Sequence, residues 1–256
     1  MEIRSHFVQR LRAGLFNLGP FALLLGIWWG LSALQVVDAV FLPSPWRTFQ
    51  SFLRLISGEF ISQHLAPSSF RIGAAFLLSM LIAAPVGIAS SQLPVIARLV
   101  TPVFAFTRYL PVAAFVPLCI LWFGIDDPQK IAVIVIGVMF QLTLLFAADT
   151  ASVPGELVET GRTLGLTRFQ ILRRIVLPWS MPAIWDDLRI SAGWAWSYLV
   201  LAELVAGNRG IGYFIVQSQR YLETDRVFAA ILFVGLLGAL TDFAFRFSKT
   251  RLFRWL

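Results

Sequence analysis

The sequence has little of what a soluble enzyme needs. Cys119 is its only cysteine, so one chain cannot form a disulfide, a CxxC pair or a thiolate metal site, and we expect this residue to be a small buried hydrophobe. No GxxxxGK[ST] segment occurs, so the chain does not hold ATP phosphates by that loop. Charged residues make up only 14% of the chain, roughly half the share of a soluble domain. The low charged fraction argues against a typical soluble protein, and the other two absences exclude an intrachain disulfide, a thiolate metal site and a P-loop.

The sequence has instead many long apolar runs. Hydrophobic residues make up 58% of the chain, and runs of about 18 or more residues with few charges recur along it. Each run can cross about 30 Å of hydrocarbon as a helix rising about 1.5 Å per residue. The predicted fold class is an all-α membrane protein, with a single transmembrane domain over residues 1–256. Its six expected transmembrane helices are Leu18–Val37, Ile72–Ala89, Leu99–Phe123, Ile131–Ala148, Ala183–Val205 and Val227–Phe245.

Lysine and arginine are unevenly distributed between the segments that join these helices. The formal net charge of +7 is better explained by membrane orientation than by nucleic acid binding. With the N-terminus inside, the inner segments carry Arg4, Arg10, Arg12, Arg98, Arg162, Arg168, Arg173, Arg174, Arg246, Lys249, Arg251 and Arg254. The outer segments carry Arg47, Arg54, Arg71, Lys130, Arg209, Arg220 and Arg226. This bias predicts cytoplasmic termini, residues 1–17 as a cytoplasmic tail, and a retained first helix rather than a cleaved signal peptide.

The first outer loop, residues 38–70, is too long for a simple turn. Its apolar residues recur at helical spacing after Pro43 and Pro45 and before Gly58, which predicts a surface helix. The residues that share its apolar face are Trp46, Phe49, Leu53 and Ile56. Such a helix either lies at the membrane interface or forms a docking face for an external partner.

The third and fifth spans contain the candidate residues of a translocation path. The third span contains Pro102, Pro111 and Pro117, which are expected to break it, and Arg108 and Tyr109 lie just before the middle break. Arg108 either attracts an anionic substrate or forms a buried ion pair that holds the broken helix. In the fifth span the candidates are Trp194, Ser197 and Glu203. Packing and substrate contact are both open for its aromatic residues, and Glu203 and Arg189 are expected to form structural ion pairs.

A charged, glycine-interrupted segment between two spans, residues 150–182, predicts two short helices at an angle on the cytoplasmic face. Ser152 is expected to cap the first helix and Gly165 to end it, because glycine adopts the left-handed conformation at little cost. Thr167 and Gln170 have the spacing of a capping box, and Leu166 and Ile171 that of a hydrophobic staple. We expect Pro178 and Pro182 to break the chain before the fifth span. The segment alone fits a linker, a lipid anchor or a docking element.

This segment resembles the EAA motif, E-A-A-x3-G-x9-I-x-L-P, of permease subunits of binding-protein-dependent ABC importers. Glu159 and Gly165 match, as do Ile175, Leu177 and Pro178, whereas Thr160 and Gly161 replace the alanines. Further stretches resemble the nitrate/sulfonate/taurine type of permease from about residue 20 to the end. They are FLPSPWRTFQSF, SSFRIGAAF, RYLPVAAFVPLCILWFGIDDPQKIAVI, LRISAGWAWSYLVLAEL and GNRGIGYFI.

The resemblance implies a type I importer permease in the bacterial inner membrane. The implied partners are a second permease copy, two cytoplasmic ATPase subunits that bind ATP and magnesium, an extracytoplasmic solute-binding protein and the lipid bilayer, with no nucleic acid and no cofactor in this chain. The implied solutes are nitrate, bicarbonate, alkanesulfonates, taurine or pyrimidine-type compounds. The implied ATPase-coupling residues are Glu159, Gly161, Arg162, Leu164, Gly165, Leu166 and Thr167.

Two other classes of function fit the sequence less well than a permease subunit does. Intramembrane charges such as Arg108, Asp149 and Arg189 could serve a secondary transporter or channel, but no inverted halves are visible and the twin-helix segment would have no role. An intramembrane enzyme is disfavoured because no G-x-S-x-G elbow occurs. The aspartate pairs 126–127 and 186–187 and the two histidines, His6 and His64, lack metal-ligand spacing.

Overall fold

The computed structural model describes residues 19–56 and 58–254, and all regular structure in that part of the chain is helical. The expected cytoplasmic tail, residues 1–17, lies outside the described residues. The first described helix is Gly19–Ala33. The later elements are α2 (Pro45–Leu55), α3 (Gly58–Phe60), the π turn η1 (Ile61–Leu65), α4 (Ala66–Gln92), α5 (Pro94–Thr107), α6 (Val112–Phe123), α7 (Asp127–Ala151), α8 (Gly155–Thr163), α9 (Arg168–Ile171), the π turn η2 (Leu172–Val176), α10 (Leu177–Ala206), α11 (Ile211–Arg220) and α12 (Thr224–Leu252).

The chain forms two compact units, and the division falls within α11 and α12. The first unit consists of Met1–Gly58 and Ile215–Phe233. Within it, Trp28 stacks on Phe228 with ring centroids 5.6 Å apart and donates its indole N–H to the Pro43 carbonyl at 2.9 Å. Ser51 on α2 also donates a hydrogen bond to Asp225. These contacts hold the helix Gly19–Ala33 and α2 against the start of α12.

The expected surface helix is present as α2. It begins after Ser44, whose hydroxyl accepts a hydrogen bond from the Arg47 N–H at 3.3 Å, with proline in its first turn. Thr48, Ser51 and Leu55 are buried, and the apolar face predicted from the spacing is exposed. The loop around this helix is shorter than the predicted residues 38–70, because helical structure resumes at Gly58.

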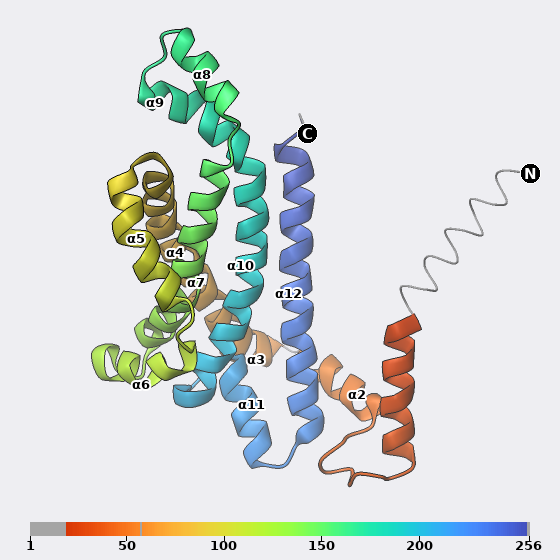
Figure 1. The fold of residues 1–256 in the computed structure, drawn as a ribbon. Coiled ribbons are helices and arrows are strands. Elements are labelled where there is room, and N and C mark those ends of the chain that lie inside the picture. Colours follow the sequence, from red (N-terminus) through yellow and green to blue (C-terminus); the bar gives the residue numbers. More distant parts are fainter. Residues whose placement is uncertain (1–18, 57, 255–256) are drawn as a thin grey trace, which may run out of the picture. The chain divides into compact units, whose positions relative to one another are not determined.

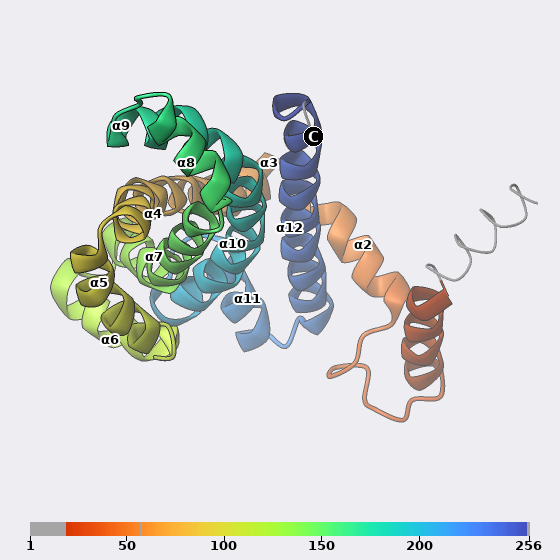
Figure 2. The same cartoon turned by 45° about the horizontal axis from the view of Figure 1, so that its top comes forward.

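The second unit, Glu59–Phe214 and Val234–Leu256, is built on three long helices. Helices α4, α7 and α10 run side by side in it, with α5 and α6 packed along α7 (Figures 1 and 2). Gly87 permits the close approach of α4 and α7, since a Cβ there would lie 2.6 Å from the Thr143 carbonyl oxygen. Cys119 is buried with Val116, Val133 and Ala202, as expected for a small apolar residue.

Both π turns precede a proline by the same spacing. Pro67 and Pro178 each stand two residues after the end of a π turn, η1 and η2 respectively. Proline lacks the N–H that would bond the carbonyl four residues earlier, and the widened turn lets the helix continue. In η2 the Leu177 N–H bonds the Leu172 carbonyl, five residues back. The expected break before the fifth span is therefore wrong: α9, η2 and α10 are continuous, and Pro182 lies inside α10.

The third predicted span is broken at one point rather than three. Helices α5 and α6 meet at a bend of 101°, and the bend falls between Thr107 and Val112. Pro102 lies inside α5 and Pro117 inside α6, so neither ends a helix. Pro111 ends the break because it serves as the N-cap residue of α6. It also restricts the residue before it to extended conformations.

Length and composition support some of the six predicted spans directly. Three helical stretches are long and apolar enough to cross a membrane, Gly58–Gln92, Asp127–Ala151 and Thr224–Leu252, and the bent α5–α6 pair makes a fourth if it is one span. The helix Gly19–Ala33 is shorter. Helix α10 has 30 residues but carries Asp186, Asp187 and Arg189 near its start and Glu203 near its end. The count of six stays a prediction.

Candidate functional site

The predicted bend of the charged segment is present at Gly165. Gly165 has φ of +75°, and a Cβ placed on it would meet no atom within 4 Å, so its role is conformational. The N–H of Leu166 bonds the Gly161 carbonyl at 3.0 Å, and the N–H of Gly165 bonds the Arg162 carbonyl at 2.9 Å. This pair of bonds is a Schellman motif, which satisfies the last carbonyls of α8 and fixes the exit direction of the chain.

The next helix begins with the predicted capping box. The Thr167 hydroxyl accepts the Gln170 N–H at 3.3 Å, and the Gln170 side chain accepts the Thr167 N–H at 2.8 Å. The predicted cap of the first helix is wrong, since Pro154 occupies the cap position of α8. The Ser152 hydroxyl donates instead to the Asp149 carbonyl at the end of α7. Ser152 therefore belongs to the preceding helix, as its position one turn after Asp149 allows.

All seven candidate coupling residues lie in this one helix–turn–helix. Gly161 is buried, and a Cβ on it would lie 2.6 Å from the end of the Ile175 side chain, so glycine lets α8 pack closely on η2. Glu159, Arg162 and Thr167 are exposed, whereas Leu166 is half-buried toward Gly161. Leu164 is 74% exposed and the neighbouring Phe169 is 69% exposed. A strongly fixed turn thus presents large apolar side chains to the outside, which is typical of a binding surface.

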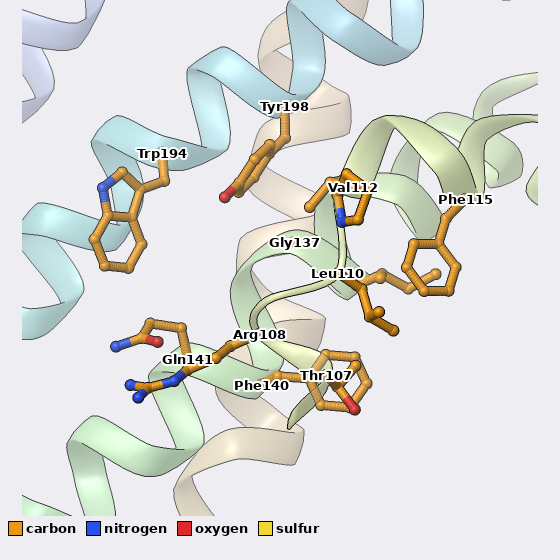
Figure 3. A pocket seen from close by; sticks show the side chains of 12 residues that line it. Thr107, Arg108, Leu110, Val112, Phe115, Gly137, Phe140, Gln141, Trp194 and Tyr198 are labelled. Carbon is orange, nitrogen blue, oxygen red and sulfur yellow. The ribbon is translucent and has the colours of Figure 1, made fainter. Parts of the chain in front are cut away.

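The break between α5 and α6 opens a cavity of about 490 Å³ in the second unit. Helices α5 and α6 contribute the break itself, and α7 and α10 form the other walls. Figure 3 shows Trp194 and Tyr198 projecting from α10 on one side, with Arg108 and Gln141 on the facing side. The lining residues are Thr107, Arg108, Leu110, Pro111, Val112, Phe115, Ile136, Gly137, Phe140, Gln141, Trp194 and Tyr198.

Arg108 does not form the buried ion pair that was one of the two alternatives predicted for it. Its Nη2 donates to the Tyr109 hydroxyl at 2.9 Å, and its guanidinium carbon lies 4.9 Å from the centre of the Tyr109 ring. No carboxylate forms an ion pair with it in the described part of the chain. Tyr109 itself is exposed and does not line the cavity. Its contact with the cavity is indirect, through the hydrogen bond and the ring contact that position Arg108. The guanidinium keeps further donors for a ligand.

The path candidates Arg108, Pro111 and Trp194 line this cavity, whereas Ser197 and Glu203 do not. Ser197 is exposed on α10. Arg189, which was expected to form structural pairs, lies 3.6 Å from Asp242 and 3.7 Å from Asp186.

Glu203 lies at the other end of α10, inside a buried charge cluster. Its side chain and that of Arg71 are both fully buried, 2.6 Å apart. Arg71 also binds Asp127, at 2.8 Å from Nε and 2.6 Å from Nη2, although the sequence placed Arg71 in an outer loop. Glu203 further accepts the Ser68 hydroxyl and the Gly212 N–H, both at 2.8 Å. Every charge is paired and hydrogen-bonded, so the cluster ties α4, α7 and α10 together.

Lys130, another charge placed in an outer segment, is also buried at this end of α7. Its Nζ donates to the Ile125 carbonyl at 2.6 Å and to the Asp126 carbonyl at 3.3 Å, so it caps the loop before α7 from within. Arg71 and Lys130 lie near the starts of their helices, which begin earlier than the apolar runs do. The sequence analysis places both charges in loops because it ends each predicted span where the apolar run ends. The helices themselves extend beyond the apolar runs.

Several cavity residues have only weak signals in the sequence. Gln141 is a lone amide in the apolar run Ile131–Ala148, which is the signal that could have indicated it. Gly137 lies one helical turn before it, where a Cβ would be 2.5 Å from the Tyr198 ring, so glycine makes room for the tyrosine. Phe140 and Phe115 carried no signal, since apolar residues are common in any span.

Comparison with known proteins decides the class of this chain. Residues 75–254 match the family described as the inner membrane component of binding-protein-dependent transport systems. This chain belongs to that family. It is a membrane permease of the ABC importer type, and such permeases work with ATPase and solute-binding partners. This family has a transport role and is distinct from secondary transporters and channels.

The similar proteins of known name include permeases for several solutes. The taurine transport system permease protein TauC of Escherichia coli (strain K12) is 32% identical over 244 residues, which cover 93% of this chain and 89% of that protein. The putative aliphatic sulfonates transport permease protein SsuC of Bacillus subtilis (strain 168) is 33% identical over 235 residues, covering 91% and 85%. The nitrate import permease protein NrtB of Leptolyngbya laminosa is 27% identical over 187 residues, covering 73% and 67%.

Solved structures confirm the fold class. The inward-facing MetNI methionine ABC transporter gives a TM-score of 0.63 at 18% identity, covering 76% of this chain and 94% of that one. A bacterial ABC transporter that imports the acidic polysaccharide alginate gives a TM-score of 0.60 at 18% identity, covering 94% and 99%. The chain therefore has the all-helical fold of type I importer permeases.

Proposed function

We propose that this chain is one of two identical transmembrane subunits of an ATP-driven importer for a small anion. A solute-binding protein delivers the anion outside, and two ATPase subunits drive transport from the cytoplasm. The observation that carries the proposal is the rigid turn between α8 and α9, whose fixed geometry presents exposed Leu164 and Phe169. The EAA resemblance supports assigning this surface to the ATPase.

The position of this turn within the second unit supports the assignment. Helices α8 and α9 lie at the end of α7 and α10 that is remote from the Arg71–Glu203 cluster (Figure 1). Arg162, Arg168, Arg173 and Arg174 are exposed around the turn, as the positive-inside rule requires of a cytoplasmic segment. With this end in the cytoplasm, the buried cluster and the start of α7 lie on the outer side. The cytoplasmic location of both termini is proposed from the predicted six spans and the distribution of lysine and arginine.

The cavity and the relatives support an anion as the solute. Arg108 brings an uncompensated positive charge to the cavity wall. The named relatives are permeases for taurine, aliphatic sulfonates and nitrate, which share an oxyanion group. The α5–α6 break is where we place the translocation path, with Arg108, Pro111 and Trp194 facing it, Tyr109 holding Arg108, and Ser197 and Glu203 outside the cavity.

The test is uptake of a labelled anion into proteoliposomes that contain the permease, its ATPase and its binding protein. Uptake should require all three proteins and ATP on the ATPase side. Leu164→Asp and Phe169→Asp should prevent co-purification of the ATPase, because each buries a charge in an apolar contact. Thr163→Asp, at an exposed position of α8 that is not among the proposed coupling residues, is the matched control and should leave co-purification intact. ATP-independent uptake, or ATPase binding by both apolar variants, would refute the proposal.

A further inference from the structure

We propose that the cavity at the α5–α6 break selects a particular kind of anion: an oxyanion head on a short apolar tail, as in an alkanesulfonate, without a positive charge on the tail. This inference takes only the direction of transport, import, from the proposed function. The relatives include permeases for aliphatic sulfonates and for taurine, whose tail carries an ammonium group. The chemistry of the cavity separates these two kinds of solute.

The head would be bound by hydrogen-bond donors that are wholly or partly free within the described part of the chain. Arg108 uses one nitrogen on Tyr109, and a guanidinium has five N–H donors. The Gln141 amide, the Trp194 indole N–H and the Tyr198 hydroxyl form no hydrogen bond with other described residues, and all three line the cavity. Oxyanions accept several such bonds, and bonds from a charged donor are the strongest.

The start of α6 adds to the same positive region. Pro111 provides no side-chain cap for α6, and Val112, its first residue, lines the cavity. The free N–H groups of a helix start favour a nearby negative charge. This effect supports the cavity and Arg108 and does not define a site by itself.

The tail would lie against an apolar wall. Leu110, Val112, Phe115, Ile136 and Phe140 form this side of the cavity. At about 490 Å³ the cavity is in the usual range for small-molecule sites, and a bare inorganic anion would leave the wall in contact with water. Each methylene buried there should raise affinity about fourfold.

An ammonium group on the tail would be unfavourable. None of the described lining residues is an aspartate or a glutamate, so a cationic tail would lose water without gaining a carboxylate. The positive charge of Arg108 would repel it as well. The cavity should therefore prefer ethanesulfonate to taurine, although the two share the same head and chain length.

Equilibrium binding tests this preference without transport. Isothermal titration of the permease–ATPase complex in lipid nanodiscs, without ATP or binding protein, would use ethanesulfonate, taurine and nitrate as probes. Ethanesulfonate should bind at least about tenfold more tightly than either of the others. Equal or tighter binding of taurine would overturn the selection against a cationic tail, equal binding of nitrate would overturn the role of the apolar wall, and no binding of any probe would overturn the site.

Variants assign the binding to this cavity. Arg108→Gln should weaken ethanesulfonate binding at least about tenfold, whereas Arg98→Gln, an exposed arginine on the same helix, should leave it unchanged. Should Arg108→Gln fail to elute as a folded complex, Gln141→Leu and Tyr198→Phe provide the same test. Wild-type affinity in all of these variants would refute the assignment. Binding without ATP-driven uptake would instead refute the proposed function, and uptake without binding would refute this inference alone.

Discussion

At the scale of single residues, two glycines share a positive φ and differ in location. Gly165 at the coupling turn has φ of +75°, Gly124 after α6 has φ of +76°, and neither would contact another atom through a Cβ. Valine is strained at both positions, by roughly 1–2 kcal/mol or more at Gly165 and by at least as much at Gly124, whose ψ of −164° lies outside the left-handed helical region. Only Gly165 sets the direction of the surface that we propose binds the ATPase.

Gly165→Val should therefore abolish stimulation of ATPase activity by the loaded binding protein, whereas Gly124→Val should retain it. Thr167→Ala, which removes the cap at about 1 kcal/mol, should give a milder defect than Gly165→Val. The measurement is ATPase activity and uptake in reconstituted vesicles. Normal coupling in Gly165→Val would mean that the segment is only a linker.

Gly137 is the second residue whose size has a consequence for function. A Cβ would lie 2.5 Å from the Tyr198 ring, so Gly137→Ala must displace the tyrosine into the cavity at about 1–3 kcal/mol of overpacking. The apparent affinity of uptake should fall in this variant. Gly193→Ala on α10 is the control, since no atom lies within 4 Å of its Cβ. Identical uptake by the two variants would contradict a path through this cavity.

At the scale of elements, the ion pairs that buried Arg71 forms with Asp127 and with buried Glu203 join three helices. Arg71→Met leaves two carboxylates without their buried partner, which costs about 3–5 kcal/mol. Arg209→Met removes a half-exposed partner of Asp127, and exposed pairs contribute about 0–1 kcal/mol. The melting temperature of the detergent-solubilised protein should fall strongly in the first variant and little in the second. Equal melting temperatures would mean that the cluster does not hold the helices together.

Local signals predicted some elements well and others not at all. The capping box at Thr167 and the bend at Gly165 follow from backbone chemistry within a few residues, so the sequence alone was sufficient. The predicted break at Pro178 is wrong because the π turn η2 lets the helix continue through this proline. A π turn depends on the packing of the whole helix, which a short segment does not encode. Gln141 and Gly137 were missed because a cavity is a property of four helices together, and no short segment encodes it.

At the scale of the whole molecule, the orientation in the membrane is a prediction from the positive-inside rule. On a Cys119→Ser background, a cysteine at exposed Asn208 should react with an impermeant thiol reagent added outside intact cells. A cysteine at exposed Thr167 should react only after the membrane is opened. Labelling of Thr167 from outside would reverse the topology and remove the ATPase from this surface.

Hydropathy found the apolar core of each long helix, but the helices extend beyond those cores. The stretch predicted as Ile72–Ala89 is part of Gly58–Gln92, because Arg71 is neutralised within the fold instead of lying in water. Short segments of one chain do not show whether its permease partner is a second identical copy. The homodimer therefore rests on family resemblance and is tested by cross-linking single-cysteine variants of the permease.

The π turn η2 has one more consequence, which concerns rotational phase. Residues of a straight α-helix are about 100° apart around its axis, so the single extra residue held in η2 sets the angle between the α9 surface and every side chain on α10. Deleting that residue would change the length of the α9–η2–α10 helix by only one residue. It would turn Phe169 about a quarter of the way around the axis relative to Trp194. A one-residue gap at η2 between two related sequences would therefore change the direction in which the α9 surface faces relative to α10. It would not change the length of a loop.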